Sequence, residues 1–177
     1  MKKSEGQDLK KQVFVVGAGA SGLMAAIQAA INGAAVTVLE QNDRPGRKIC
    51  ATGNGRCNFS NLARPDDAYR GEHPEFVEDA LREFSVQNTI EFFKEIGIYP
   101  LNRNGYLYPR SNQAQSVVDV LCMEAASLGV KIKTNEQVTE IKTGTNEKNF
   151  QILTKGWHYD ADALILANGS RACSVSG

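Results

Sequence analysis

Residues 13–40 read VFVVGAGASGLMAAIQAAINGAAVTVLE, and this stretch decides the fold class. The run VFVV is short and β-branched between polar residues and glycine, which is typical of a buried parallel strand. The segment from Ser21 to Asn32 is rich in helix formers, and Gly33 stands where a helix commonly ends in a left-handed residue. AAVTVLE then predicts a second strand that ends at Glu40. The order strand, glycine turn, helix, strand predicts a βαβ unit with a right-handed crossover.

The turn before the helix carries three glycines, Gly17, Gly19 and Gly22, with the spacing GxGxxG. The first permits a tight turn, the second lets a pyrophosphate approach the main chain, and the third lets the helix pack closely on the strand. The N–H groups of Ala20 and Ser21 would then face the phosphates, where the helix dipole adds about 0.3–1 kcal/mol. This pattern predicts a site for the ADP part of a dinucleotide.

Glu40 ends the second strand, where a carboxylate can accept hydrogen bonds from both ribose hydroxyls of ADP. A charged hydrogen bond of this kind is worth about 1.5–3 kcal/mol. The same charge would repel a 2'-phosphate, so NADP is disfavoured at this site. The plainer alternative is that the glycines serve only the turn and the packing, and that Glu40 is a surface acid. The register of strand, glycines, helix and acid favours the nucleotide site.

Charge and length limit the classes of partner. The chain has 177 residues, with 20 Lys and Arg against 20 Asp and Glu. This balance gives no long-range field that draws nucleic acid or an anionic membrane to a protein, so neither partner is expected. No apolar run approaches the roughly 20 residues that cross a bilayer, and no signal-peptide core follows the basic start. We expect a soluble, cytoplasmic protein whose residues 1–11 form a flexible tail.

The rest of the chain predicts a mixed α/β order. A long functional loop is expected from Gln41 to Tyr69, because Gly, Asn, Arg and Pro are frequent there. Helices are expected at 73–84, at 86–97 with Ser85 as its cap, and at 112–129 after Ser111. NRNG at 102–105 predicts a turn between short strands, and 138–159 predicts an antiparallel meander. Further strands are expected at 130–134 and 163–167.

Four segments together resemble a known family: GAGASGLMAAIQAA, LEQNDRPGRKICATGNGRCNFSN, GYLYPRSNQAQSVVDVL and ALILANGS. RPGRK followed by GNGRCN is the specific part. The family is that of bacterial aminoacetone-oxidase-like and bile-acid-pathway FAD-dependent oxidoreductases. The resemblance implies an α/β fold, a Rossmann-like FAD-binding domain of the glutathione-reductase type with a parallel sheet, helices on both faces and a small antiparallel β-meander. It also implies that residues 12–177 are the N-terminal portion of that domain, cut from a longer chain.

The resemblance assigns flavin contacts to the segment after the second strand. By that likeness, Arg47 and Lys48 approach the phosphate and ribose side of FAD. The turn GNGRCN, which contains Gly53, Asn54 and Gly55, would lie beside the isoalloxazine ring.

The resemblance also assigns contacts near the end of the chain. Val138 matches the position whose main chain meets adenine. Ala167 and Gly169 match a motif usually read as ATGG near the pyrophosphate. This sequence has ANGS instead, which leaves the contacts of Asn168 and Ser170 open.

Three polar residues of the GNGRCN turn are candidates for contact with the flavin or the substrate. Arg56 could stabilise an anionic reduced ring or bind a substrate carboxylate, and a surface arginine is the alternative. Asn54 and Asn58 could donate hydrogen bonds to flavin heteroatoms, and the alternative for both is a turn-forming role. Arg56 and Asn58 are therefore the predicted catalytic residues.

Two other clusters favour plainer interpretations. Cys50 and Cys57 lie where flavin disulfide reductases keep a redox pair, but their spacing is longer than in those enzymes, so packing thiols are favoured. Tyr106, Tyr108 and Arg110 are expected to pack near a turn rather than to contact a substrate. The cysteines and histidines show no zinc spacing, so no metal is expected.

The sequence and the resemblance together predict an enzyme that transfers hydride between FAD and a reduced nicotinamide or an organic substrate. FAD is the expected cofactor, NAD(P)H is a candidate electron donor, and a small molecule is the expected substrate. Two alternatives remain at this point. One is a flavin- or NAD-binding module in RNA modification or regulation, and the other is a plain NAD-dependent dehydrogenase domain.

Overall fold

The computed structural model describes residues 10–63, 68–144 and 148–169. They divide into two compact units, of which the first comprises Met1–Gly46 and Cys122–Gly177 and the second Arg47–Leu121. Most of the expected tail lies outside the described residues, as do Ser170 and Cys173. The assignment of residues 12–177 to the first portion of a larger domain stays a prediction.

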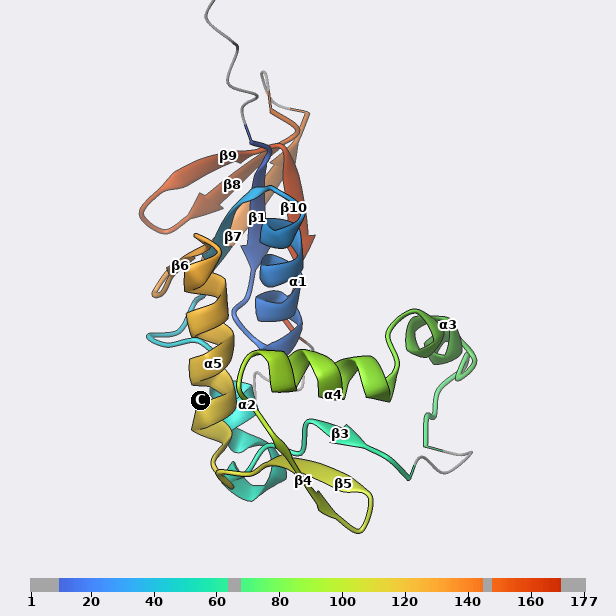
Figure 1. The fold of residues 1–177 in the computed structure, drawn as a ribbon. Helices are drawn as coiled ribbons and strands as arrows, with labels where there is room; N and C mark the ends of the chain where they lie inside the picture. Colours follow the sequence, from blue (N-terminus) through green and yellow to red (C-terminus); the bar gives the residue numbers. More distant parts are fainter. Residues whose placement is uncertain (1–9, 64–67, 145–147, 170–177) are drawn as a thin grey trace, which may run out of the picture. The chain divides into compact units, whose positions relative to one another are not determined.

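The first unit is built on a parallel sheet of four strands (Figure 1). In spatial order these strands are β10 (Ala163–Leu166), β1 (Gln12–Val16), β2 (Ala35–Leu39) and β6 (Lys131–Lys133). Numbered by chain order and read from the β6 edge, the strands run 3-2-1-4, the order of a dinucleotide-binding half-domain. The α/β class is confirmed.

Helix α1 (Ala20–Ile31) connects β1 to β2 and lies alongside the sheet in Figure 1. Its Leu23 and Ile27 are fully buried, as are Val15 of β1 and Val38 of β2. Burying a side chain of this size is worth about 1.5–3 kcal/mol. Gly33 follows the helix with a φ of 87°, a left-handed conformation that glycine adopts without strain. The predicted strand, helix and strand are therefore confirmed.

The other strands of the first unit form the predicted antiparallel meander. These strands are β7 (Val138–Thr143), β8 (Phe150–Thr154) and β9 (His158–Ala161). Phe14 and Leu39 of the parallel sheet share a buried cluster with Ile152 and Ala161 of the meander. The rings of Phe14 and Tyr159 lie 5.2 Å apart within it. This apolar contact fixes the meander to one face of the parallel sheet.

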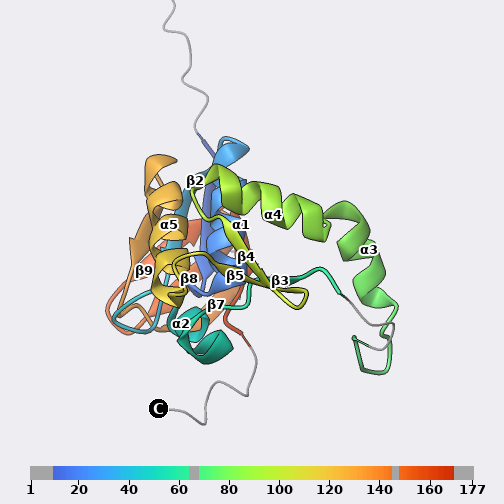
Figure 2. The same ribbon diagram turned by 60° about the horizontal axis from the view of Figure 1, so that its bottom comes forward.

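The second unit combines short helices with a three-stranded antiparallel sheet, which Figure 2 shows from below. Its elements are α2 (Arg47–Ala51), the 3-10 turn η1 (Thr52–Gly55), β3 (Ser60–Asn61), α3 (Phe76–Glu83), α4 (Val86–Glu95), β4 (Pro100–Arg103) and β5 (Tyr106–Pro109). The long loop expected at 41–69 therefore contains a helix, a 3-10 turn and a strand, and that prediction is wrong in part. The helix α5 (Ala114–Ser127) begins in this unit and ends in the first.

Turn chemistry in the second unit follows the sequence closely. Ser85 caps α4 in a reciprocal capping box with Asn88, as predicted. Asn104 and Gly105 have φ values of 52° and 91°, which join β4 to β5 in the expected tight turn. Helix α5 begins at Ala114, two residues later than expected, because Ser111 closes a local turn by accepting from Gln113 N at 3.3 Å.

Candidate functional site

The three glycines of the GxGxxG turn have different reasons to lack a side chain. A Cβ at Gly22 would lie 1.9 Å from the carbonyl oxygen of Gly17, and one at Gly17 would lie 2.5 Å from that of Ala167. Gly17 also has a φ of 101°. A Cβ at Gly19, in contrast, would meet no atom of the chain within 4 Å, and its φ of −80° suits any residue. The fold thus needs Gly17 and Gly22, whereas the open space at Gly19 is available to a ligand.

The first turn of α1 presents main-chain N–H groups beside this space. Gly19 is the N-cap residue, and no side chain caps the helix. The first N–H groups of a helix have no partner within it, and Ala20 and Ser21 are exposed. The first turn carries no acidic residue that would repel an anion. These features fit a pyrophosphate held by the main chain at the helix N-terminus.

The end of β10 lies next to the same turn. Ala167 donates its N–H to Val16 O at 2.8 Å, and Asn168 Cα is 3.2 Å from the position of a Cβ at Gly17. Gly169 follows with a left-handed φ of 79°. The structure thus brings Ala167 to the glycine turn, at the point where the strand order of the parallel sheet reverses. Ligands of doubly wound sheets bind at such a point.

Glu40 is 6% exposed, and its carboxylate is already hydrogen-bonded. Oε2 accepts from Ala18 N at 2.8 Å, while Oε1 accepts from Asn42 N at 2.9 Å and from Asn42 Nδ2 at 2.5 Å. A carboxylate offers about four acceptor positions, so one remains, on Oε2. Glu40 can therefore accept a hydrogen bond from one ribose hydroxyl while it keeps its hydrogen bond from Ala18 N in the glycine turn. Accepting both, as predicted from the sequence, would require the Asn42 side chain to move.

Val138, the residue predicted to contact adenine, follows a segment that is hydrogen-bonded to Glu40. Glu40 N donates to Lys133 O at 2.9 Å, and Glu136 N donates to Glu40 O at 2.8 Å. Two residues further on, Val138 packs against the cluster that contains Leu39. The main chain at 136–138 and the Glu40 carboxylate thus belong to one corner of the first unit. This arrangement fits adenosine, with the ribose near Glu40 and the base near Val138.

The other predicted cofactor residues belong to the second unit. Arg47 and Lys48 begin α2, and the turn that follows is left-handed, with φ values of 56° at Gly53, 55° at Asn54 and 78° at Gly55. A Cβ at Gly53 would lie 2.8 Å from Asn58 N. Consecutive left-handed residues are rare because a Cβ clashes there, so the glycines permit this turn.

Within this turn, Asn58 is held by the adjacent strands. Its Nδ2 donates to Ser60 O and to Leu107 O, both at 3.1 Å. Both amide protons are thereby used, so a ligand would meet Asn58 through Oδ1, as an acceptor. Arg56 is half-buried, and its main-chain N–H donates to Gly53 O at 3.2 Å. The predicted catalytic roles of Arg56 and Asn58 stay predictions.

The two cysteines of this segment are both free thiols. Burial raises the pKa of the Cys57 thiol, an effect opposed by its hydrogen bond with Thr52 and reinforced by Cys50. Cys50 is half-buried and donates to Gln115 Oε1 at 3.3 Å. A thiol with a raised pKa is a poor nucleophile, and Cys57 is buried, which fits the packing role favoured from the sequence.

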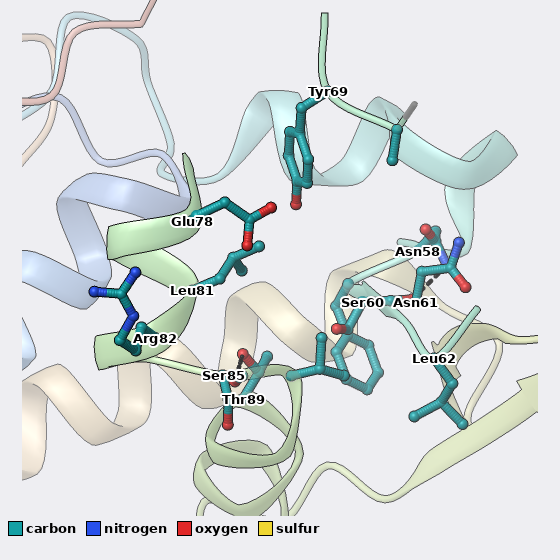
Figure 3. A pocket seen from close by; sticks show the side chains of 13 residues that line it. Asn58, Ser60, Asn61, Leu62, Tyr69, Glu78, Leu81, Arg82, Ser85 and Thr89 are labelled. Carbon is teal, nitrogen blue, oxygen red and sulfur yellow. Dashed lines mark hydrogen bonds between the residues drawn. The ribbon is translucent and has the colours of Figure 1, made fainter. Parts of the chain in front are cut away.

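The second unit also contains an open pocket of about 860 Å³ (Figure 3). It is lined by residues 58–62, by Tyr69, and by parts of α3 and α4. In Figure 3, Glu78 and Leu81 extend from α3 on one side, and Asn58 and Asn61 lie on the other. Sequence reasoning missed this pocket because its walls come from segments with no shared motif. Only Asn58 belongs to both the pocket and the predicted site.

The described residues lack two other kinds of feature. They include no helix long and apolar enough to cross a membrane. They also include no group of three or more His, Cys, Asp or Glu side chains placed to hold a metal ion.

Two curated relatives are similar along most of this chain. The sequence is 44% identical over 168 residues to the 3-dehydro-bile acid delta(4,6)-reductase of Clostridium scindens, a match that covers 94% of this chain and 41% of that protein. It is 32% identical over 159 residues to the ribosomal RNA dihydrouridine synthase of Haemophilus influenzae, a match that covers 88% of this chain and 39% of that protein. The chain therefore spans about two fifths of the length of these relatives.

A solved structure is similar in fold to this chain. The 3-ketosteroid-delta4-(5alpha)-dehydrogenase of Rhodococcus jostii, in complex with 4-androstene-3,17-dione, aligns with a TM-score of 0.68 and 19% identity, over 95% of this chain and 47% of that one. This likeness shows the fold alone. The aminoacetone-oxidase part of the expected resemblance is tested by none of these proteins and stays a prediction. The family of HI0933-like protein Rossmann domains matches residues 11–177, and the chain belongs to that family.

Proposed function

We propose that this chain is the FAD-binding portion of an oxidoreductase. The observation that carries the proposal is Gly19, which is bare although the fold leaves room there for a side chain. It stands beside uncapped main-chain N–H groups and within the same unit as the buried Glu40 carboxylate. A pyrophosphate would fill the space at Gly19, Glu40 would bind the ribose, and Val138 would meet adenine. Ala167 and Gly169 would close the pyrophosphate site.

Two features favour FAD over NAD as the dinucleotide. A plain NAD-binding domain continues from its first βαβ unit with alternating strands and helices, whereas here a meander separates β6 from β10. The segment RPGRK and GNGRCN, which resembles the flavin-binding part of the family named above, also supports FAD. In this proposal, Arg47 and Lys48 neutralise phosphate charge, and the left-handed turn at Gly53, Asn54 and Gly55 lies beside the flavin ring.

The proposed reaction is the reduction of a conjugated double bond in an apolar carbonyl compound, with NAD(P)H as the electron donor. It is supported by the relative of 44% identity, which is named as a delta(4,6)-reductase. FAD, when bound, supplies the ability to accept a hydride and pass it on. Arg56 would place a positive charge near the group that gains electron density, and Asn58 would orient a neighbouring N–H through its Oδ1.

A second candidate is the reduction of a pyrimidine ring in RNA. It is supported by the relative named as a ribosomal RNA dihydrouridine synthase, although that identity is lower, at 32%. Reduction of uridine to dihydrouridine also saturates a ring double bond, so the same cofactor chemistry would serve. The zero net charge of this chain gives no electrostatic attraction to RNA and favours the first candidate.

The visible spectrum of the full-length protein tests the proposal. A yellow preparation with a flavin spectrum that NADH or NADPH bleaches under anaerobic conditions is expected. A colourless preparation that binds NADH would contradict the FAD proposal and favour a plain NAD-dependent domain. Re-oxidation of the bleached protein by a steroid enone, but not by unmodified ribosomal RNA, is expected. The reverse preference would support the RNA candidate instead.

A further inference from the structure

The pocket of the second unit has an uncharged floor. Its half-buried lining includes the apolar Phe59, Val86 and Leu81 and the hydroxyl-bearing Ser60 and Thr89. None of these side chains carries a charge. Desolvating a charged ligand group against such a floor would be costly, because no opposite charge compensates it there. The floor therefore fits a body that is mainly apolar and uncharged.

The described lining of the pocket includes two charged residues, one of each sign, and both lie on α3. Glu78 and Arg82 are both exposed, and Arg82 pairs with Asp79 of the same helix at 3.1 Å. An exposed pair of this kind contributes little binding energy. The lining residues that the structure describes thus offer no concentrated positive charge for a phosphate or a carboxylate.

Ser60 gives the floor one hydrogen-bonding group that the described part of the chain leaves unused. Its Oγ makes no hydrogen bond to any residue that the structure describes, and it lines the pocket in Figure 3. Thr89, in contrast, donates its hydroxyl proton to Ser85 O at 3.1 Å. The carbonyl oxygen of a bound ligand could accept a hydrogen bond from the Ser60 hydroxyl while the apolar part of the ligand packs against Phe59 and Val86.

We propose that this pocket binds an uncharged, multi-ring carbonyl compound, with Ser60 as the donor to its carbonyl oxygen. A volume of about 860 Å³ lies within the range of known small-molecule sites, which is about 300–1,000 Å³. Asn58 joins the pocket to the GNGRCN turn, so the ligand would be a substrate or product of the proposed oxidoreductase. That last step rests on the proposed function, whereas binding itself does not.

Calorimetry on the full-length protein tests this site, with 4-androstene-3,17-dione as the uncharged probe and uridine 5'-monophosphate as the anionic one. The dione is expected to bind and the nucleotide is not. Thr89→Phe adds a ring on the pocket side of α4 and is expected to weaken binding of the dione by about tenfold or more. Gln87→Phe adds the same ring on an exposed position of α4 outside the pocket and should leave binding unchanged.

A second variant covers the case in which Thr89→Phe does not fold. Ser60→Ala removes only the hydroxyl and is expected to weaken binding of the dione by about two- to tenfold. The proposal is contradicted if dione binding is unchanged in every one of these variants that folds. It is also contradicted if uridine 5'-monophosphate binds and Thr89→Phe blocks that binding. A colourless protein that still binds the dione in a Thr89-dependent way would contradict the FAD proposal and leave this site intact.

Discussion

Gly19 and Gly22 lie three residues apart, yet they are expected to respond differently to the same added methyl group. Gly19→Ala meets open space and should change the free energy of unfolding by less than about 1 kcal/mol. It should nevertheless weaken FAD retention by about tenfold or more, because the methyl group occupies the space proposed for the pyrophosphate. The measurements are thermal unfolding and the FAD dissociation constant of the full-length protein.

Gly22→Ala is the matched control for that prediction. Its Cβ would lie 1.9 Å from Gly17 O, so the helix must move away from the strand. The expected loss of stability is about 1–3 kcal/mol or more. If Gly19→Ala instead destabilises the protein as much as Gly22→Ala does, the space at Gly19 serves folding and not a ligand.

The cysteines offer a test that depends on pH. Because burial raises the pKa of Cys57, its reactive thiolate forms only at higher pH than for an ordinary thiol. Iodoacetamide should therefore label the half-buried Cys50 before Cys57 in the native protein, and the Cys57 rate should rise only at higher pH than that of an ordinary thiol. Mass spectrometry of the labelled peptides measures both rates. Rapid labelling of Cys57 at neutral pH would revive the redox interpretation.

Among the elements, α4 depends on its cap. Ser85 Oγ accepts from Asn88 N at 3.2 Å, and Asn88 Oδ1 accepts from Ser85 N at 2.9 Å. Ser85→Ala should lower the free energy of unfolding by about 1 kcal/mol. Ser85→Thr keeps the hydroxyl and should recover most of this loss. Equal losses for the two variants in urea unfolding would show that the hydroxyl bond contributes nothing.

The junction of β1 with the β9–β10 corner contains a pH-sensitive ion pair. Asp162 accepts from Lys148 Nζ at 2.7 Å and from Gln12 N at 2.7 Å, and these bonds lower its pKa. A lowered folded pKa stabilises the protein above the ordinary Asp value of about 3.9, and this stabilisation is lost as the pH falls through the folded value. Asp162→Asn should therefore reduce the unfolding midpoint at neutral pH, and the difference should shrink in acid. A difference that stays constant with pH would exclude the ionised carboxylate as its cause.

Elements with a clear period or a turn signal could be predicted from sequence. The βαβ unit, the meander and the capped α4 carry such signals, and the structure has them close to the expected bounds. Helix α2 and strand β3 were missed because they have five and two residues, too few to show a period. The helix expected at 73–84 is observed as α3 at 76–83, but the sequence did not show that Phe76 would be 82% exposed. Exposure depends on what packs nearby, which a helical pattern alone does not specify.

The sequence predicted the part of the candidate site that depends on glycine spacing. It did not predict which hydrogen bonds the polar side chains of the site make with the rest of the protein. The GxGxxG turn and Glu40 were found by spacing. The bonds from Ala18 and Asn42 to the Glu40 carboxylate have no sequence signal, because they depend on how the chain turns after β2. The hydrogen bonds that the Asn58 side chain donates to Ser60 O and Leu107 O likewise have no sequence signal.

For the whole molecule, the first unit contains the proposed ADP site, and the second contains the GNGRCN turn and the pocket. The residues proposed to bind the cofactor, such as Gly19 and Arg56, therefore occur in both units. Binding measurements should therefore use the full-length protein, which contains both units.

A crystal structure of the full-length protein with FAD bound is the most direct measurement. We predict pyrophosphate oxygens about 2.7–3.2 Å from the N–H groups of Ala20 or Ser21, above Gly19, with a ribose hydroxyl donating to Glu40 Oε2. A structure in which FAD binds elsewhere, with Gly19 facing only solvent and Glu40 bonded only to Ala18 and Asn42, would contradict the proposed function.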